Sequence, residues 1–361
     1  MRIVHIVDQF DYCDGCARHV FFLARAQKES GHEVTIVAGR GDAFALLHRE
    51  KLSFREIPFI HHATRSVTGF FRGAWMLRDL FASLKPDIVH CHHFYTANQA
   101  RAFSRRCPIV LTLHANLPKG GLLPKCIGDM LIAVSKSTKT WALRNYPAFA
   151  NKVIVIPNTS EFLGLDDEVR SSPKFQEFLK KKPGAFVVVY SGRLVKAKGV
   201  QNLIAAISRL KAEIPILFLV AGSGEKELEL KVQASLLSVD TMFFGSVRDV
   251  RPLLEASDVV VLPSLSAEGM PMTIFEAGLL GRPIIASNTD GIPEMIQDGV
   301  SGMLVPPGDV DQLANALRRL YVEPQMRNRL GASLQERIKT NSIRNMADRV
   351  LSAYRGLART D

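Results

Sequence analysis

The stretch VVVLPSLSAEGMPMTIFEAGLLGRPIIASNTDGIPE, residues 259–294, contains two short apolar runs with a helical pattern between them. The first run, residues 259–262, predicts a buried strand, and residues 283–286 predict a second one. Between them we expect a turn, a loop and then a helix over residues 272–280, which Gly281 ends. A strand, a loop, a helix and a strand in this order are typical of a parallel α/β sheet.

Two carboxylates in this stretch, Glu268 and Glu276, lie eight positions apart, the first on the predicted loop and the second in the predicted helix. The first turn of a helix has unpaired amide groups and the positive end of the helix dipole, which suit a phosphate. Met272 and Thr273 are placed to offer such amides. Glu276 would then accept the hydroxyls of a ribose on that phosphate, and Glu268 would face the far end of a diphosphate. An isolated pair of this kind is more often a solvated loop glutamate and a helix glutamate that only favours the dipole.

The neighbouring motifs favour the functional interpretation. The stretch resembles the donor site of glycosyltransferase family 4, the retaining nucleotide-sugar transferases of the GT-B fold. The family pattern is Glu, seven residues, Glu, a Gly-x-Pro strand and a Gly-x-Pro-Glu turn, here completed by residues 281–283 and 291–294. The donor-binding residues that this resemblance implies here are Glu268, Gly269, Met270, Met272, Thr273 and Glu276.

The length and composition predict an α/β protein of two domains that stays in the cytoplasm. The chain has 361 residues, enough for two ordinary domains. No apolar run approaches the ~20 residues of a membrane-spanning helix. The first residues, MRIVHIVDQFD, form one short strand-like run before Asp8 and do not resemble a signal peptide.

The cysteines predict neither a disulfide framework nor a metal site. All five lie before residue 127, and their number is odd. Cys13 and Cys16 form a C-x-x-C pair with His19 close behind, and Cys91 stands among His90, His92 and His93. A zinc or redox site would need a second thiol pair at ligand spacing or a thioredoxin-like context. We therefore expect no metal and no other cofactor.

Basic residues gather in the first half of the chain. Residues 1–158 hold 21 Lys and Arg against 11 Asp and Glu, a net of +10, whereas the remainder holds 25 against 24, a net of +1. Such asymmetry indicates a surface that meets anions. No recognised nucleic-acid motif accompanies the charge, so an anionic membrane is favoured over nucleic acid.

Two series of alternating strand and helix patterns predict two Rossmann-like domains in tandem. The expected domains are 1–158 on the acceptor side and 183–340 for nucleotide-sugar binding. Residues 159–182, rich in Ser and Lys, predict an exposed connector. Residues 341–361 predict an amphipathic helix. By resemblance to GT-B proteins, this helix crosses back to the N-terminal domain, and the two parallel sheets face each other across a cleft.

Cations follow the first strand of the second series, in the run SGRLVKAKG. Arg193 and Lys198 stand on this loop, and preplaced cations neutralise the charge that grows on a departing diphosphate. Two solvated loop cations are the plainer interpretation of an isolated pair. The family carries Arg and Lys here as diphosphate ligands, so the resemblance assigns both residues to catalysis and donor binding.

Glycine-rich loops follow other predicted strands. Gly222, in the run AGSGE, is placed to cradle a nucleotide, but the third glycine of a dinucleotide fingerprint is missing. The resemblance places this loop beside the donor site and the run around Val247 beside the nucleobase. In the loop DYCDGCARHV, Gly15 matches the second of two adjacent family glycines that approach the donor phosphate. Asp14 replaces the first, which is unfavourable beside a diphosphate unless its carboxylate turns away.

Two histidines end strands of the first series. A histidine in this position is more often a hydrogen-bonding residue than a catalyst. His114, in LTLHA, matches a family histidine that faces the transferred sugar and the acceptor, so the resemblance assigns it a catalytic role. His92 matches a position with a structural role.

The function that we expect is the retaining transfer of a hexose from a nucleotide donor, UDP-linked, to an acceptor hydroxyl without a metal. The acceptor would be a glycolipid or a saccharide precursor of a cell-surface polysaccharide, met at the inner face of the plasma membrane. Glu268, His114, Arg193 and Lys198 would carry the chemistry. A nucleotide-sugar epimerase of the same fold and a non-catalytic nucleotide-sugar-binding protein stay open as alternatives.

Overall fold

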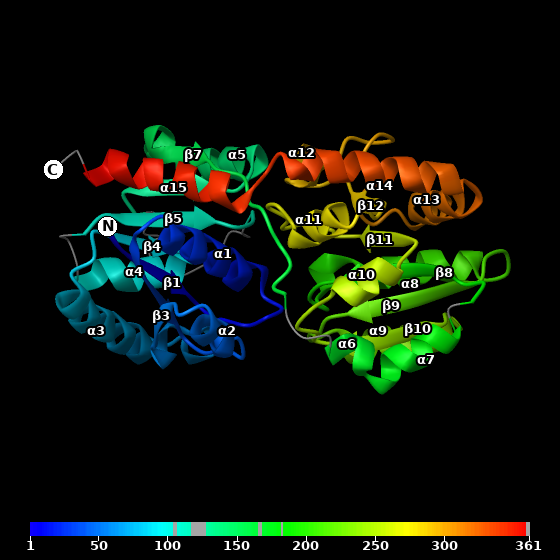
Figure 1. Ribbon diagram of the computed structural model, residues 1–361, viewed down its shortest axis with the longest axis horizontal. Coiled ribbons are helices and arrows are strands. Elements are labelled where there is room, and N and C mark those ends of the chain that lie inside the picture. The colour runs from blue at the N-terminus through cyan, green and yellow to red at the C-terminus, as the bar shows by residue number, and fades with distance from the viewer. Residues whose placement is uncertain (104–106, 117–127, 165–167, 182, 359–361) are drawn as a thin grey trace. The chain divides into compact units, whose positions relative to one another are not determined.

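The chain forms two compact units, shown in Figure 1. The computed structural model describes residues 1–103, 107–116, 128–164, 168–181 and 183–358. One unit, here called the N-terminal domain, comprises Met1–Ser160 and Asn341–Asp361. The other, the C-terminal domain, comprises Glu161–Thr340. The last segment of the chain therefore belongs to the same unit as the first.

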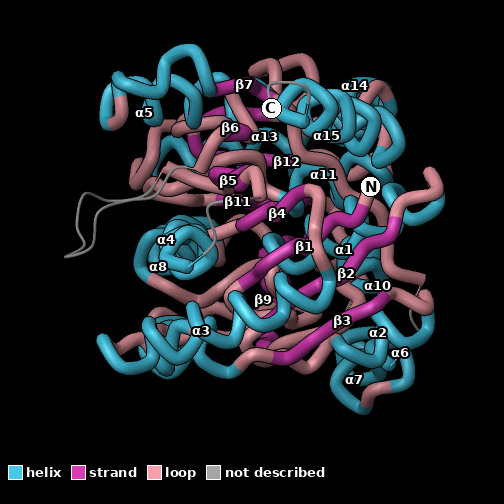
Figure 2. The backbone as a smooth tube through the Cα atoms, turned by 90° about the vertical axis from the view of Figure 1, so that its left-hand side faces the viewer, coloured by secondary structure: helices cyan, strands magenta, loops and turns pink. Residues whose placement is uncertain are grey.

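The N-terminal domain is built on a parallel sheet of seven strands in the order β3-β2-β1-β4-β5-β6-β7, seen in Figure 2. Its strands are nearly all apolar because helices cover both faces. Their bounds are β1 (Arg2–Val7), β2 (Glu33–Ala38), β3 (Ser53–Glu56), β4 (Ile88–Cys91), β5 (Ile109–Leu113), β6 (Met130–Ala133) and β7 (Val153–Val155). The edge strand β3, with the sequence SFRE, is mostly exposed and has no apolar run that predicts it.

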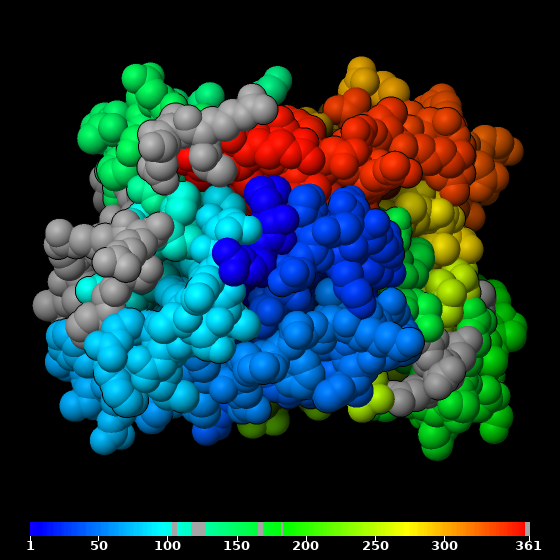
Figure 3. All heavy atoms as spheres, turned by 60° about the vertical axis from the view of Figure 1, so that its left-hand side comes forward, coloured from blue at the N-terminus to red at the C-terminus, as the bar shows by residue number. Residues whose placement is uncertain are grey.

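Helices and short 3-10 turns cover this sheet. They are α1 (Gly15–Glu29), α2 (Phe44–Arg49), η1 (Pro58–Ile60), η2 (His62–Thr64), α3 (Val67–Leu84), α4 (Phe94–Phe103), α5 (Lys136–Asn145), η3 (Pro147–Lys152) and α15 (Ile343–Ala358). The C-terminal helix α15 packs against α1, and Figure 3 shows its red residues beside the blue ones. Met346, Val350 and Tyr354 of α15 are buried, as its helical periodicity predicts.

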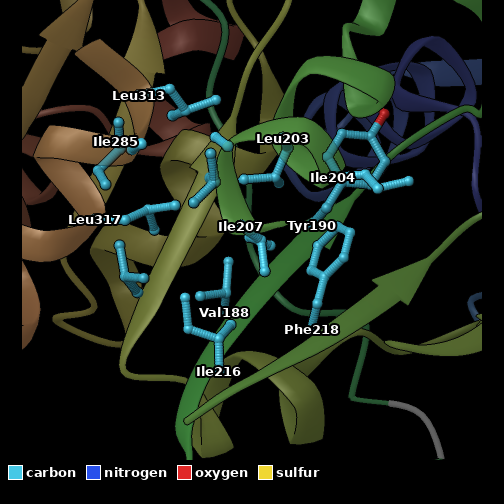
Figure 4. Packing of buried hydrophobic residues seen from close by; sticks show 14 of the residues in the cluster. Val188, Tyr190, Leu203, Ile204, Ile207, Ile216, Phe218, Ile285, Leu313 and Leu317 are labelled. Carbon is cyan, nitrogen blue, oxygen red and sulfur yellow. The ribbon is translucent and has the colours of Figure 1, made fainter. Parts of the chain in front are cut away.

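The C-terminal domain is built on a second parallel sheet, of six strands in the order β10-β9-β8-β11-β12-β13. Their bounds are β8 (Phe186–Ser191), β9 (Ile216–Ala221), β10 (Thr241–Gly245), β11 (Val259–Leu262), β12 (Ile284–Ser287) and β13 (Met303–Val305). Apolar residues fill both faces of the sheet. Figure 4 shows one face, where Tyr190 of β8 and Phe218 of β9 pack with Leu203 and Ile204 of a covering helix.

The helices of this domain are α6 (Glu168–Ser171), α7 (Pro173–Lys181), η4 (Lys196–Lys198), α8 (Val200–Leu210), α9 (Glu227–Leu236), α10 (Arg251–Ala256), α11 (Met272–Leu279), α12 (Ile292–Met295), α13 (Val310–Val322) and α14 (Pro324–Lys339). None of the helices in the described ranges is both long and apolar enough to cross a bilayer.

The segment 159–182 differs from the exposed connector that its polar composition predicts. Among its described residues, α6 and α7 are helical, and Phe175 and Phe178 are buried in the core of the C-terminal domain. Phenylalanines three positions apart share one face of a helix, so α7 buries this face and leaves its lysines in solvent. The aromatic pair, and not the lysine content, decides the structure of this segment.

Candidate active site

The predicted donor-binding residues other than Gly15 gather at one edge of the C-terminal sheet. In a parallel sheet the carboxyl ends of all strands meet at the same edge, where α/β proteins bind ligands. Arg193 and Lys198 follow β8, Gly222 follows β9 and Glu268 follows β11. Three further predicted residues, Val247, Gly269 and Met270, lie on loops of the same domain that follow β10 and β11.

Lys198 and Glu268 form an ion pair within this edge. The Lys198 Nζ donates to Oε1 of Glu268, and the Ser264 hydroxyl donates to the same oxygen at 2.5 Å. The Glu268 side chain is only 5% exposed and that of Lys198 16%. Burying two charges is tolerated only where they are paired and hydrogen-bonded. The loops after β8 and β11 are therefore tied together through charged groups.

Backbone contacts hold the Glu268 loop in place. The Glu268 amide donates to Oδ2 of Asp290 at 3.1 Å, and the Gly291 amide donates to the Glu268 carbonyl at 3.1 Å. The Gly-x-Pro-Glu turn that starts at Gly291 thus supports the loop of the first glutamate. Ala267 and Asp290 have φ of 63° and 50°, a left-handed conformation that costs a non-glycine residue about 1–3 kcal/mol. Such strain gathers at ligand-binding loops.

The loop that carries Arg193 is anchored from the core. The Tyr190 hydroxyl donates to the Arg193 carbonyl at 2.8 Å, and Figure 4 shows the Tyr190 ring packed in the apolar cluster. Burial raises the pKa of this hydroxyl, so it remains a donor. The Arg193 residue itself is exposed, and its side chain is free to meet a ligand from solvent.

The helix α11 begins where the sequence predicts, at Met272. Its N-cap residue, Pro271, makes no side-chain hydrogen bond to the first turn. The Thr273 hydroxyl donates to the Ser191 carbonyl at the end of β8 at 3.1 Å. Glu276, one turn in, is buried with 2% of its surface exposed. The N-cap of α11 is a proline and its first turn has no acidic residue, which suits an anionic ligand.

Close packing of the loops requires glycine at Gly222. A Cβ atom there would lie 1.9 Å from the Gly192 carbonyl oxygen, and φ is +138°. We expect Gly222→Ala to destabilise the C-terminal domain by more than about 4 kcal/mol, because backbone atoms would have to separate. The control is Gly245→Ala, with φ of +71° and open space around the new Cβ, which should cost only about 1–2 kcal/mol. Urea unfolding measures both, and equal losses would contradict the packing argument.

The loop around Gly15 has its own anion at the start of α1. Gly15 is the first residue of α1, and Asp14 is its N-cap, with Oδ1 accepting from the Cys16 amide at 2.9 Å. The carboxylate that replaces a family glycine is thus directed into the helix terminus. It occupies the position in which a donor phosphate would meet these amides.

Five histidines of the N-terminal domain form one cluster, in which four are buried and His114 is half-buried, and the sequence patterns did not join them. They are His5, His19, His90, His92 and His114. His5 and His90 are register partners on the adjacent strands β1 and β4. The sequence places histidines repeatedly on or just after strands. It does not give the order of the strands in the sheet, which brings these histidines together.

Hydrogen bonds connect most of these rings. The closest pairs are His92 Nδ1 with His114 Nε2 at 3.0 Å and His5 Nδ1 with His92 Nε2 at 3.2 Å. Burial lowers the pKa of His5 to about 4 and the pKa of His92 and His114 well below the usual value. The cluster is therefore neutral at physiological pH.

Potential metal ligands also meet in this cluster. One ligand atom each of Cys16, His92 and His114 lies within 4.8 Å of the others, as do atoms of His5, His90 and His92. In the sequence, Cys16 and the strand histidines belong to separate groups. Cys13 is exposed, and Cys126 lies outside the described residues. Imidazole and thiolate are ligands that suit zinc.

Two family models match the chain. The model of glycosyl transferases group 1 matches residues 171–337, and that of Glycosyltransferase Family 4 matches residues 13–159. Together these ranges include most of the N-terminal domain and most of the C-terminal domain.

Individual relatives and solved structures agree with the family models. The chain is 26% identical over 363 residues to a phosphatidyl-myo-inositol mannosyltransferase of Mycolicibacterium smegmatis, covering 96% of this chain and 91% of the relative. It is 34% identical over 197 residues to the putative glycosyltransferase EpsD of Bacillus subtilis, about half of each chain. Anabaena HepE, solved with UDP and glucose, has a TM-score of 0.83 at 20% identity and covers 99% of this chain and 100% of its own. The chain belongs to the family 4 and group 1 glycosyltransferases and has the GT-B fold.

Proposed function

We propose that this glycosyltransferase moves a hexose from a UDP-linked donor to an acceptor hydroxyl, with retention of configuration and without a metal. The observation that carries this proposal is the buried Lys198–Glu268 pair at the ligand-binding edge of the C-terminal sheet. A buried cation beside a buried carboxylate offers both a diphosphate ligand and an acceptor for sugar hydroxyls. The solved complex of Anabaena HepE with UDP and glucose supports the choice of nucleotide.

In the proposed donor complex, each charged group has one task. Glu276 accepts the ribose hydroxyls, and the first turn of α11 meets the diphosphate. Arg193 and Lys198 neutralise the charge that develops on the leaving phosphate, and Glu268 holds hydroxyls of the sugar. These cations and the helix dipole supply the positive charge that a metal provides in other transferases.

The proposed reaction takes place on one face of the sugar. The bond between the anomeric carbon and the phosphate oxygen breaks, and a bond from the same carbon to the acceptor oxygen forms. The acceptor proton passes to the departing phosphate, so UDP leaves with it and no covalent enzyme intermediate is needed. His114, in the N-terminal domain, positions the sugar or the acceptor.

A UDP-release assay tests the function. The protein is incubated with a set of UDP-sugars, with and without a bacterial lipid extract, and the products are analysed for UDP and for sugar identity. Transfer predicts UDP release that depends on the acceptor, and NMR of the product gives its anomeric configuration. A donor sugar that is epimerised without acceptor would show an epimerase. Donor binding without any turnover would show a binding protein.

Substitutions of Glu276 and of Glu268 should have different effects on UDP binding. Glu276→Gln should raise the Kd for UDP by about 10- to 100-fold, because the ribose loses a charged acceptor worth about 1.5–3 kcal/mol. Glu268→Gln should leave UDP affinity unchanged or tighter, because it releases Lys198, while turnover falls. Isothermal titration with UDP measures both. Weaker UDP binding in Glu268→Gln would remove Glu268 from the sugar end of the site.

We further infer that the N-terminal domain meets its acceptor at an anionic membrane surface through α3. Val67, Phe71 and Trp75 are 75%, 55% and 54% exposed, and their spacing of four places them on one face. The exposed Arg72 and Arg78 flank this apolar stripe. Bulky apolar groups beside cations suit the boundary between lipid headgroups and acyl chains. The name of the mycobacterial relative, which states a phosphatidyl-myo-inositol acceptor, agrees with this location.

Other bulky or basic residues of the N-terminal domain make contacts within the domain. Phe81 is buried and Leu80 packs on the domain core, so these two residues cover the sheet. Trp141 and Phe149 also pack on that core. Arg65 is paired with Asp8 at 3.1 Å and lies over the Tyr95 ring. The exposed stripe of α3 is therefore the sharper target for mutation.

Liposome sedimentation checks this location. The wild-type protein should bind vesicles more strongly as their anionic lipid content rises and more weakly as salt rises, since each cation near the surface adds about 1 kcal/mol. Phe71→Ser with Trp75→Ser should abolish binding, and Arg72→Glu with Arg78→Glu should do the same. The control replaces Leu228 and Leu236 of α9, which are 75% and 79% exposed, by serine. Wild-type protein that ignores anionic vesicles would favour a soluble acceptor.

A further inference from the structure

A chain of four polar side chains leads from α1 through the N-terminal sheet to His114. The Gln27 Oε1 lies 2.7 Å from His5 Nε2, His5 Nδ1 lies 3.2 Å from His92 Nε2, and His92 Nδ1 lies 3.0 Å from His114 Nε2. Gln27, His5 and His92 are buried, whereas His114 is half-buried at the end of the chain. Each contact is short enough to be a hydrogen bond.

The direction of every bond in this chain follows from its first member. An amide oxygen only accepts, so His5 Nε2 carries the proton and donates to Gln27. His5 and His92 are buried, and the hydrogen bonds of this chain join neutral groups only, so each ring carries a single proton. His5 Nδ1 therefore accepts from His92 Nε2, and His92 Nδ1 accepts from His114 Nε2. The proton of His114 is then on Nε2, and its Nδ1 has a lone pair.

We propose that Gln27, through His5 and His92, holds His114 in the tautomer that presents Nδ1 as a hydrogen-bond acceptor. Gln27, His5 and His92 are positioning residues, since they act on a ligand only through the ring of His114. The inference deepens the proposed function and rests on it in one respect, that His114 faces the sugar or the acceptor.

A second branch orients the Gln27 amide. Its Nε2 faces the Tyr354 hydroxyl of α15 at 3.5 Å, a long and weak contact. Tyr354 Oη lies 2.6 Å from His90 Nδ1, and His90 Nε2 lies 2.7 Å from the Thr112 hydroxyl. A Tyr354 hydroxyl that accepts from Gln27 and donates to His90 leaves the His90 proton on Nε2. Turning the Gln27 amide over would reverse every proton in both branches. One amide therefore sets the polarity of the whole network, and α15 contributes to holding it.

The neighbouring His19 presents an acceptor as well. Its Nδ1 lies 2.6 Å from Oδ1 of Asn158, which also accepts from the Thr159 amide, so Nδ1 is the donor. The Nε2 of His19 is buried without a hydrogen-bond partner among the described residues, and its ring lies 4.8 Å from that of His114. Two neighbouring rings thus each offer a lone pair. They fit a ligand that donates hydrogen bonds, such as vicinal sugar hydroxyls, and disfavour a carbonyl or carboxylate.

Nitrogen-15 NMR of histidine side chains in the full chain tests the assignment directly. At neutral pH, His5, His90, His92 and His114 should each carry the proton on Nε2, whereas His19 should carry it on Nδ1. Single His→Gln variants assign the signals. A proton on Nδ1 of His114 in the wild-type protein would overturn the proposal.

The decisive variant is Gln27→Met, which keeps the length of the side chain and removes the oxygen. It should leave the three linked histidines as tautomer mixtures and leave His19 unchanged. The control is Gln99→Met, since Gln99 is also fully buried but donates to the carbonyls of Phe59 and Phe70 outside the chain. Unchanged tautomers in Gln27→Met would overturn the proposal.

A metal-binding experiment and an activity assay complete the test. Cobalt(II) added to the wild-type protein should give no thiolate charge-transfer band. A band that Cys16→Ser removes and Cys13→Ser keeps would overturn the proposal, because a metal would replace the proton between His92 and His114. In the transferase assay, Gln27→Met should lower kcat by about 10-fold with the Kd for UDP unchanged. A protein without any transferase activity would refute the proposed function while the NMR result still stands.

Discussion

Replacing Lys198 by methionine is expected to lower kcat by about 10²- to 10³-fold, the usual effect of removing one preorganised charge from a transition-state site. The Lys198 side chain is 16% exposed and is paired with the Glu268 side chain, which is 5% exposed, so water screens the charge poorly. In the proposed reaction its charge would therefore act at close range on the leaving phosphate. Arg193→Gln, on the same loop but exposed, should lower kcat on the order of 100-fold.

The control for this prediction lies two residues away. Lys196 stands on the same 3-10 turn, η4, and is exposed. Lys196→Met changes the same net charge without touching Glu268, so kcat should stay within about twofold, because exposed charges are screened. Normal rates in Lys198→Met and Arg193→Gln, together with inhibition by EDTA, would contradict the metal-free mechanism.

A double variant separates catalysis from folding. Lys198→Met alone leaves the buried Glu268 carboxylate with the Ser264 hydroxyl, and breaking a buried ion pair in this way costs about 3–5 kcal/mol. Lys198→Met with Glu268→Gln removes both charges, so most of this stability should return in urea unfolding. If the double variant is stable and still inactive, the rate loss belongs to the chemistry. If its activity returns with its stability, Lys198 is structural.

The strands and the main helix of the donor site were readable from the sequence because their patterns are local. The stretch 259–294 predicts β11 at its observed bounds and α11 to within one residue of its end. Such runs are apolar because both faces of the sheet are covered. The edge strand β3 was missed because SFRE lies mostly in solvent and needs no apolar run.

Contacts between distant segments were not readable from one sequence. The ion pair joins Lys198 and Glu268 across 70 positions, and the bond between His90 and Tyr354 spans 264. Each depends on strand order and register, which periodicity does not encode. The motif resemblance predicts which residues form a donor site, and this stays a prediction. The histidine cluster was visible only after β1, β4 and β5 were adjacent.

Acidification should unfold the N-terminal domain before the C-terminal domain. All ten histidines of the chain lie at or before residue 114, so residues 161–340 contain none. Burial lowers the pKa of His5 and His19 to about 4, and the pKa of His90, His92 and His114 falls well below the usual value. The partners of these rings are neutral groups: Gln27, Asn158, Tyr354, Thr112 and one another.

The direction of the effect follows from proton binding. A histidine has a pKa of about 6.5 in the unfolded chain, so below that pH the unfolded state binds protons that the folded cluster does not. The contribution of the neutral cluster to the free energy of unfolding is therefore fully present above about pH 7. It is lost progressively as the pH drops towards 4. At pH 5, each buried imidazole lowers the free energy of unfolding of the N-terminal domain by about 2 kcal/mol. Five of them lower it by on the order of 10 kcal/mol, which is comparable to the total stability of a domain.

Tryptophan fluorescence isolates the N-terminal domain in this experiment, because Trp75 and Trp141 are the only tryptophans of the chain. The urea midpoint from fluorescence should fall steeply between pH 7 and pH 5, while far-UV circular dichroism retains the signal of a folded C-terminal domain. His5→Gln should reduce the pH slope of the unfolding free energy by about 1.4 kcal/mol per pH unit, since one proton fewer is taken up. A fluorescence midpoint that stays flat from pH 7 to pH 5 would mean that the cluster is not buried as a neutral group.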